Sequence, residues 1–172
     1  MDLAIVSWVA EHLHTPFLDW LMPQITRLGN SGMLWLSLSF LLLLHRRTRR
    51  TGLTSLIALA LVLTVGLGVL KPLIGRARPF THLPELTLLI PPETGFSFPS
   101  GHTASSFASA LSIRFASKNG GRIALVFAAA IAFSRLYLSV HYLTDILAGV
   151  LLGCLCAYAA RWLTDGIYSK WH

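Results

Sequence analysis

Three short segments, far apart along the chain, hold residue types that suit the chemistry of a phosphorus oxyanion. They are residues 71–79, 99–102 and 134–145. Together they offer three cations for the non-bridging oxygens, a hydroxyl, two imidazoles, and one carboxylate four residues after a histidine. Transfer of a phosphoryl group needs such a set, because one group must attack phosphorus while another protonates the departing oxygen.

The segment 99–102 has the features of a helix start. Pro99 discourages helix before it, Ser100 is a good N-cap, and Gly101 lets a ligand approach the backbone closely. Free N–H groups and the positive end of the helix dipole then lie beside His102, which predicts an anion site. The same four residues also form an ordinary loop-to-helix cap, so the interpretation depends on the other two segments.

The three cations are predicted to neutralise and orient the phosphoryl oxygens, helped by donors at the helix start. The predicted phosphate-binding residues are Lys71, Arg78, Ser100, Gly101 and Arg135. No acidic cluster accompanies them, and Asp145 is the only carboxylate assigned to the site. Because acidic clusters supply the ligands of catalytic Mg²⁺, we expect neither a metal nor another cofactor.

The two histidines are assigned different roles. A histidine paired with an aspartate is the better nucleophile, because the carboxylate fixes the tautomer and stabilises positive charge. His141, with Asp145 four residues later, is therefore the predicted nucleophile, and Asp145 orients it. His102 is the predicted general acid for the leaving oxygen and later the general base toward water.

The composition is that of a membrane protein. Of 172 residues 54% are hydrophobic and 12% are charged, and the mean hydropathy is +0.64. The length favours a single domain, residues 1–172. The net charge of +7 would suggest nucleic-acid binding in a soluble protein, but the basic residues flank apolar segments. Positive-inside topology explains most of them more simply, so no nucleic-acid partner is expected.

Hydropathy and helical spacing predict an all-α bundle with about five to six transmembrane or membrane-embedded helices. The five predicted spans are residues 32–45, 52–70, 102–117, 123–138 and 144–162. The span 102–117 is rich in serine, which suits a helix packed inside the bundle. Thr144 is the expected N-cap of the last span.

The remaining residues are predicted to lie at the membrane surface. Residues 1–30 form an interfacial amphipathic segment, in which Pro16 breaks the first helix and a second short helix ends near Pro23. Residues 72–99 form an outer loop that contains six of the eight prolines. A loop of this length is usually functional. The tail to His172 is predicted to be interfacial.

Charge sets the expected orientation. The arginines within residues 46–50 mark a cytoplasmic turn, and five spans then place Lys118, Arg161 and Lys170 inside as well. The three chemistry-bearing segments fall at the opposite, outer face. Their cations break the positive-inside trend and need a separate reason to exist. The expected location is a bacterial inner (plasma) membrane, with the site facing the periplasm or cell exterior.

The three segments, in this order and spacing, resemble the type 2 phosphatidic acid phosphatase superfamily of lipid phosphatases. The family pattern is Lys-x6-Arg-Pro, then Pro-Ser-Gly-His, then Ser-Arg-x5-His-x3-Asp, and every position is matched within residues 71–145. The resemblance implies a covalent phosphohistidine at His141, an acid/base at His102, and independence of Mg²⁺. It also implies phosphate binding by Lys71, Arg78, Ser100, Gly101 and Arg135. Soluble haloperoxidases share the motifs, but five apolar spans argue against that relative.

A site at the outer membrane boundary predicts a lipid phosphate or pyrophosphate as substrate. By analogy with short bacterial members, we favour undecaprenyl pyrophosphate, hydrolysed to undecaprenyl phosphate. Phosphatidylglycerophosphate and phosphatidic acid are the alternatives. An intramembrane serine hydrolase built from Ser100, His141 and Asp145 is a remote alternative, because Ser100 lies in no Gly-x-Ser-x-Gly elbow. A non-catalytic anion transporter is another, but it would not need the His–Asp pair.

Overall fold

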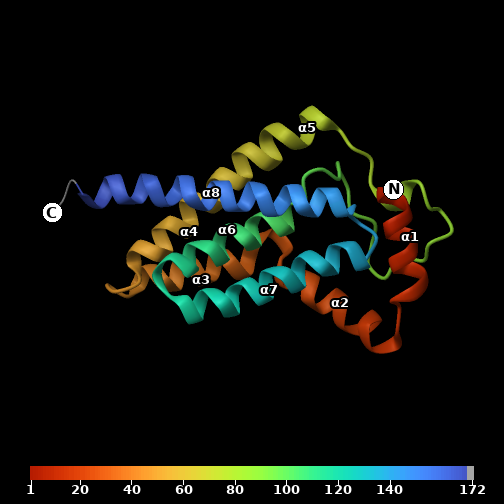
Figure 1. Cartoon of the computed structure of the whole chain (residues 1–172), viewed down its shortest axis with the longest axis horizontal. Helices are drawn as coiled ribbons and strands as arrows, with labels where there is room; N and C mark the ends of the chain where they lie inside the picture. The colour runs from red at the N-terminus through yellow and green to blue at the C-terminus, as the bar shows by residue number, and fades with distance from the viewer. Residues whose placement is uncertain (170–172) are drawn as a thin grey trace.

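The computed structural model describes residues 1–169, and within that range the chain is helical and has no strands (Figure 1). In chain order the helices are α1 (Asp2–His12), α2 (Pro16–Leu28), η1 (Asn30–Gly32), α3 (Met33–Leu44), α4 (Arg49–Leu61), η2 (Val62–Leu70), α5 (Lys71–Ile74), η3 (Pro79–Thr81), α6 (Gly101–Ala116), α7 (Lys118–Tyr137) and α8 (Leu143–Ser169). Of these, η1 and η3 are 3₁₀ helices and η2 is a π-helix. The predicted all-α class is confirmed.

By length and composition, three helices could cross a membrane. They are the run Arg49–Thr81, which contains α4, η2 and α5 and ends with η3, together with α7 and α8. The pair α2 and α3, bent by 47° at the break between them, qualifies as a fourth span only when the two are taken together. The remaining predicted span became α6, whose 16 residues extend about 24 Å, less than the roughly 30 Å of a hydrocarbon core.

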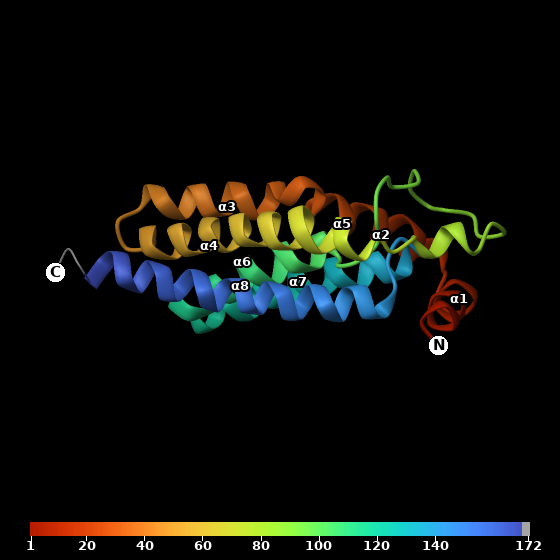
Figure 2. The ribbon, with the colours of Figure 1, turned by 90° about the horizontal axis from the view of Figure 1, so that it is seen from above.

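The short α6 lies inside the bundle, where α4, α7 and α8 pack against it (Figure 2). Its hydroxyl-bearing side chains are buried between these neighbours, at Thr103, Ser106, Ser109 and Ser112. A Cβ at Gly153 of α8 would lie 2.5 Å from the carbonyl oxygen of Ala104, so only glycine allows this approach. Small residues that let helices approach closely are typical of membrane bundles. The prediction that residues 102–117 pack inside the bundle is confirmed.

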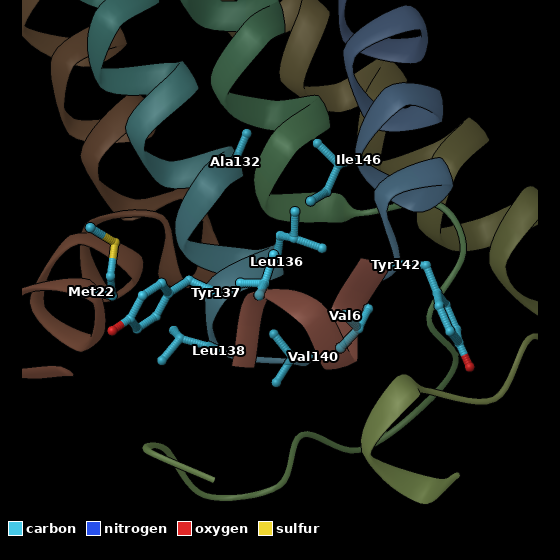
Figure 3. Close-up of a cluster of buried hydrophobic side chains, with 10 residues drawn as sticks. Val6, Met22, Ala132, Leu136, Tyr137, Leu138, Val140, Tyr142 and Ile146 are labelled. Carbon is cyan, nitrogen blue, oxygen red and sulfur yellow. The ribbon is translucent and has the colours of Figure 1, made fainter. Parts of the chain in front are cut away.

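The N-terminal helices lie at one end of the molecule, over the end of α7 and the start of α8 (Figures 1 and 3). Val6 of α1 and Met22 of α2 join a buried cluster with Leu136, Val140 and Ile146. The cluster therefore covers the turn between α7 and α8. The assignment of residues 1–30 to the membrane interface stays a prediction, but α2 packs directly against α7.

Two predicted boundaries were wrong. The second helix does not end near Pro23 but continues to Leu28, because Pro23 and Thr26 are buried in the bundle and packing offsets the missing hydrogen bond of an internal proline. The last helix begins at Leu143, so Thr144 lies in its first turn and is not its N-cap.

The far end of the bundle carries the arginines of the turn between α3 and α4. Arg50, in the first turn of α4, forms an ion pair with Asp165 of α8. The last helix runs to Ser169, beyond its predicted end at residue 162. Lys170 and the rest of the predicted interfacial tail to residue 172 lie outside the described residues.

Candidate active site

The three segments singled out in the sequence meet at the end of the bundle where the N-terminus lies (Figure 1). A cavity of about 580 Å³ opens there. Its polar wall comes from all three segments, from the loop before α6 and from α6 itself: Lys71, Arg78, Glu93, Gly101, His102, Ser105 and His141. The other predicted site residues, Ser100, Arg135 and Asp145, are fully buried directly behind this wall.

His141 and Asp145 form a buried pair. His141 Nδ1 lies 3.4 Å from Asp145 Oδ2, and both side chains are almost completely hidden from solvent. The same carboxylate oxygen accepts the Tyr142 N–H at 2.9 Å and the Ser97 hydroxyl proton. With Nδ1 turned toward the carboxylate, Nε2 is the nitrogen that can face the cavity. Asp145 thus fixes the tautomer of His141. It also caps the start of α8 by accepting the Tyr142 N–H.

The protonation state of His141 follows from its burial. Burial lowers its pKa, and the Arg135 and Arg78 charges lower it further, to about 4, although the Asp145 carboxylate opposes this change. The imidazole is therefore neutral at pH 7. A neutral imidazole has the free electron pair that a nucleophile needs.

The two arginines share one carboxylate. Glu93 Oε2 lies 2.8 Å from Arg78 Nη1, and Glu93 Oε1 forms an ion pair with Arg135 Nη2. Burial raises the pKa of Glu93, but the Arg135 and Arg78 charges outweigh this and lower it to about 2. Asp145 is therefore not the only carboxylate at the site. The error has a physical reason, because Glu93 lies in a proline-rich loop whose fold has no periodic pattern.

Both guanidiniums are held by further buried contacts. Arg78 donates to the carbonyl oxygens of Val140 at 3.0 Å and Gly95 at 3.1 Å. Arg135 donates to the Thr26 hydroxyl at 2.6 Å, so α2 takes part in building the site. Thr26 could not have been identified from the sequence, because a single threonine in an amphipathic helix carries no recognisable signal.

The start of α6 has the predicted capping geometry. The Ser100 hydroxyl accepts the Thr103 N–H at 3.5 Å and the Thr103 hydroxyl proton at 3.0 Å, and it is fully buried. The predicted N-cap is confirmed. The hydroxyl is thereby occupied inside the cap, whereas the first N–H groups of the helix have no partner within it and can bind an anion.

His102 is held from the N-terminal side of the bundle. Its Nε2 lies 2.9 Å from the side-chain oxygen of Asn30, an acceptor, so Nε2 carries a proton. The preceding Gly29 makes this contact possible, because a Cβ there would lie 2.7 Å from the His102 ring. Asn30 begins η1, just after the end of α2, and its side-chain contact depends on tertiary packing alone.

The rest of the cavity is apolar. Leu36 of α3, Leu56 of α4 and Leu63 of η2 line it further along the bundle from Lys71, and Leu67 lies beside Gly101. Leu63 and Leu36 are 61% and 37% exposed. The cavity therefore has a charged end and an apolar end.

Comparison with known proteins identifies the family. The model of the PAP2 superfamily matches residues 51–168. An undecaprenyl-diphosphatase of Sulfolobus acidocaldarius is 32% identical over 137 residues, which cover 79% of this chain and 66% of that protein, slightly under two thirds of its length. The crystal structure of Aquifex aeolicus LpxE is similar with a TM-score of 0.82 and 27% identity, over 92% of this chain and 93% of that one.

A second solved structure supports the same family assignment. The PAP2-type phosphatidylglycerolphosphate phosphatase of Bacillus subtilis is 31% identical with a TM-score of 0.74, over 98% of this chain and 85% of that one. The relatives differ in the substrates that their names give, but they share the fold and the family. The molecule is a multi-pass membrane phosphatase, and the chain belongs to the PAP2 superfamily.

Proposed function

We propose that the protein hydrolyses the phosphate or pyrophosphate group of a membrane lipid through a phosphohistidine intermediate at His141. The observation that carries the proposal is the buried His141–Asp145 pair, whose histidine lines the same cavity as His102, Lys71 and Arg78. The family match supports the phosphatase class. The covalent intermediate and the role of each residue are our assignment.

In the proposed reaction, His141 Nε2 attacks phosphorus while the bond from phosphorus to the leaving oxygen breaks. His102 gives that oxygen the proton that its Nε2 shares with Asn30 in the free site. Asp145 stabilises the positive charge that develops on His141. Water then attacks phosphorus, His102 accepts one of its protons, and the bond between phosphorus and Nε2 breaks to release inorganic phosphate and restore both histidines.

The phosphoryl group would be held at the charged end of the cavity. Lys71, Arg78 and Arg135 supply the cations, and the N–H groups of Gly101 and His102 supply donors. We assign Ser100 to the phosphate site through the helix start that its cap fixes. A serine-hydrolase mechanism is disfavoured for the same reason, because the Ser100 hydroxyl is buried in the cap.

The apolar end of the cavity supports a lipid substrate. An acyl or prenyl chain can lie along the leucine side chains of α3, α4 and η2 while its phosphate reaches the histidines. We favour undecaprenyl pyrophosphate, because the relative aligned over 79% of this chain is named as an undecaprenyl-diphosphatase. Phosphatidylglycerophosphate is the competing substrate, after the name of the Bacillus subtilis relative. We place the site on the periplasmic or exterior side.

The test is phosphate release from undecaprenyl pyrophosphate, phosphatidylglycerophosphate and phosphatidic acid in detergent. We expect the highest kcat/KM with the first, and comparable values on all three would reject our substrate assignment. His141→Ala and His102→Ala should abolish release, whereas His82→Ala, an exposed histidine of the outer loop, should not change it. Full activity of the His141 variant would overturn the mechanism. Excess EDTA should leave activity unchanged, and strong inhibition would indicate a metal.

A further inference from the structure

Arg76 lies between two carboxylates at the edge of the site, although it occupies none of the motif positions. Its Nη1 lies 2.7 Å from Asp145 Oδ1, and its Nη2 lies 2.7 Å from Asp2 Oδ2. The guanidinium carbon also lies 3.7 Å from the centre of the Tyr142 ring. The two carboxylates hold the edges of the planar guanidinium and the Tyr142 ring covers one face, so the group has little freedom to move.

The two oxygens of Asp145 have separate partners. Oδ2 faces His141 and accepts the protons of Ser97 and Tyr142, whereas Oδ1 is held by Arg76. Without Arg76, Oδ1 would lose its charged partner inside the protein. The carboxylate could then rotate about its terminal bond and turn away from His141. Arg76 therefore holds the plane of the carboxylate that orients the nucleophile.

Asp2 completes the arrangement from α1. Its carboxylate accepts the Thr144 hydroxyl proton and the Thr144 N–H, and the same hydroxyl accepts from Arg76 at 2.6 Å. Burial raises the pKa of Asp2, but the hydrogen bonds from Thr144 and Arg76 outweigh this and lower it, so Asp2 is ionised at neutral pH. Asp2 thus balances the charge of Arg76.

This balance matters for the chemistry. An arginine paired with Asp145 alone would offset the negative charge that must stabilise the phosphorylated His141. With Asp2 beside it, the arginine is neutralised, and Asp145 keeps its effect on the imidazole. The N-terminal helix is in turn fixed by the burial of Val6 and Val9.

We propose that Arg76 is a positioning residue that fixes Asp145 for the nucleophile, and that Asp2 makes α1 part of the catalytic machinery. The inference rests on the proposed function of His141. It assigns a catalytic contribution to an N-terminal helix that the sequence suggested to be only a surface segment.

The test compares Arg76→Gln, Arg76→Lys and Asp2→Asn with Arg122→Gln, a matched change at an exposed arginine of α7 far from the site. Arg76→Gln should lower kcat roughly 10- to 100-fold, the scale of a misplaced catalytic group, with KM changed less than about twofold. KM should stay nearly unchanged because Arg76 does not line the cavity. Arg76→Lys should recover part of kcat, since the ammonium keeps the charge and one contact.

Asp2→Asn should cause a smaller loss, and adding it to Arg76→Gln should cause no further loss, because Asp2 acts through Arg76. Unchanged kcat in Arg76→Gln would overturn the inference, as would equal changes of kcat and KM. The inference would also fail if Arg76→Lys had no higher kcat than Arg76→Gln. If the losses of kcat added up in the double variant, Asp2 would not act through Arg76. Wild-type protein that releases no phosphate from any lipid would instead refute the proposed function.

Discussion

Glu93 makes a direct test of the phosphate site possible. Its carboxylate bridges Arg78 and Arg135, the two guanidiniums that we propose to hold the phosphoryl group. A bound phosphate must therefore compete with Glu93 for the same N–H donors. Glu93→Gln removes the charge of the competitor while keeping its size. We expect the variant to bind phosphate and its mimic vanadate more tightly than the wild-type protein.

The size of the effect follows from the environment of Glu93. The pKa of Glu93 falls from 4.5 to about 2, which corresponds to roughly 3 kcal/mol in favour of the ionised carboxylate in its place. A displaced carboxylate stays near the cations, and glutamine keeps one hydrogen bond, so only part of this energy is gained. We expect about 1–2 kcal/mol, which is roughly a tenfold lower inhibition constant for vanadate.

The same substitution should destabilise the protein without vanadate. Arg135 is fully buried and Arg78 is 4% exposed, so loss of their carboxylate leaves two buried charges without an ionic partner. Breaking a buried pair in this way costs about 3–5 kcal/mol. Thermal unfolding in detergent should therefore show a lower Tm for Glu93→Gln, and vanadate should restore more of it than in the wild type. Glu85→Gln, in the exposed part of the same loop, is the control.

Weaker or unchanged vanadate inhibition in Glu93→Gln would refute the reasoning. It would mean that Glu93 holds the arginines in place for the phosphate and does not compete with it. The pH dependence gives a second check. A carboxylate with a lowered pKa stabilises the folded state above its ordinary pKa of 4.5, and this contribution is lost as the pH falls toward 2. The free energy of unfolding should therefore fall less between pH 5 and pH 2 in Glu93→Gln than in the wild-type protein.

Three further outcomes are expected. The acid limb of kcat/KM should lie near pH 4, because protonated His141 cannot attack phosphorus, and a limb near 6.5 would contradict its buried, neutral state. Thr26→Val should lower stability by about 1–3 kcal/mol, measured by unfolding in detergent, because Arg135 loses a buried acceptor. Gly153→Leu should impair folding, because even a Cβ would meet the Ala104 oxygen at 2.5 Å; a normal Tm would show that α8 can shift.

The sequence predicted the parts of the fold and site that have local patterns. Apolar runs predicted the helices, the small residues of 102–117 predicted a buried α6, and Ser100 was recognisable as an N-cap. The meeting of three distant segments followed from topology. These features could be predicted because each depends on neighbouring residues or on the length of a helix.

The partners of the motif residues could not be predicted in this way. Glu93, Ser97 and Asn30 lie in loops and turns, and their contacts depend on how those segments fold back over the bundle. One signal was available for Glu93. Buried cations need counter-ions, and a carboxylate in the loop just before the Pro-Ser-Gly-His segment was a reasonable candidate. Thr26 offered no comparable signal.

The charges of the site now form a connected set. Glu93 forms ion pairs with both Arg78 and Arg135, and Asp2 balances the charge of Arg76, which also contacts Asp145. Charges at membrane depth are costly unless they are paired, which accounts for this pairing. Among the described residues, Lys71 is the site cation without a carboxylate within 4 Å, and it lines the cavity. In the proposed mechanism, Lys71 is therefore the cation that attracts an incoming phosphate first, and Glu93 is the carboxylate that must give up its place for the phosphate to reach the arginines.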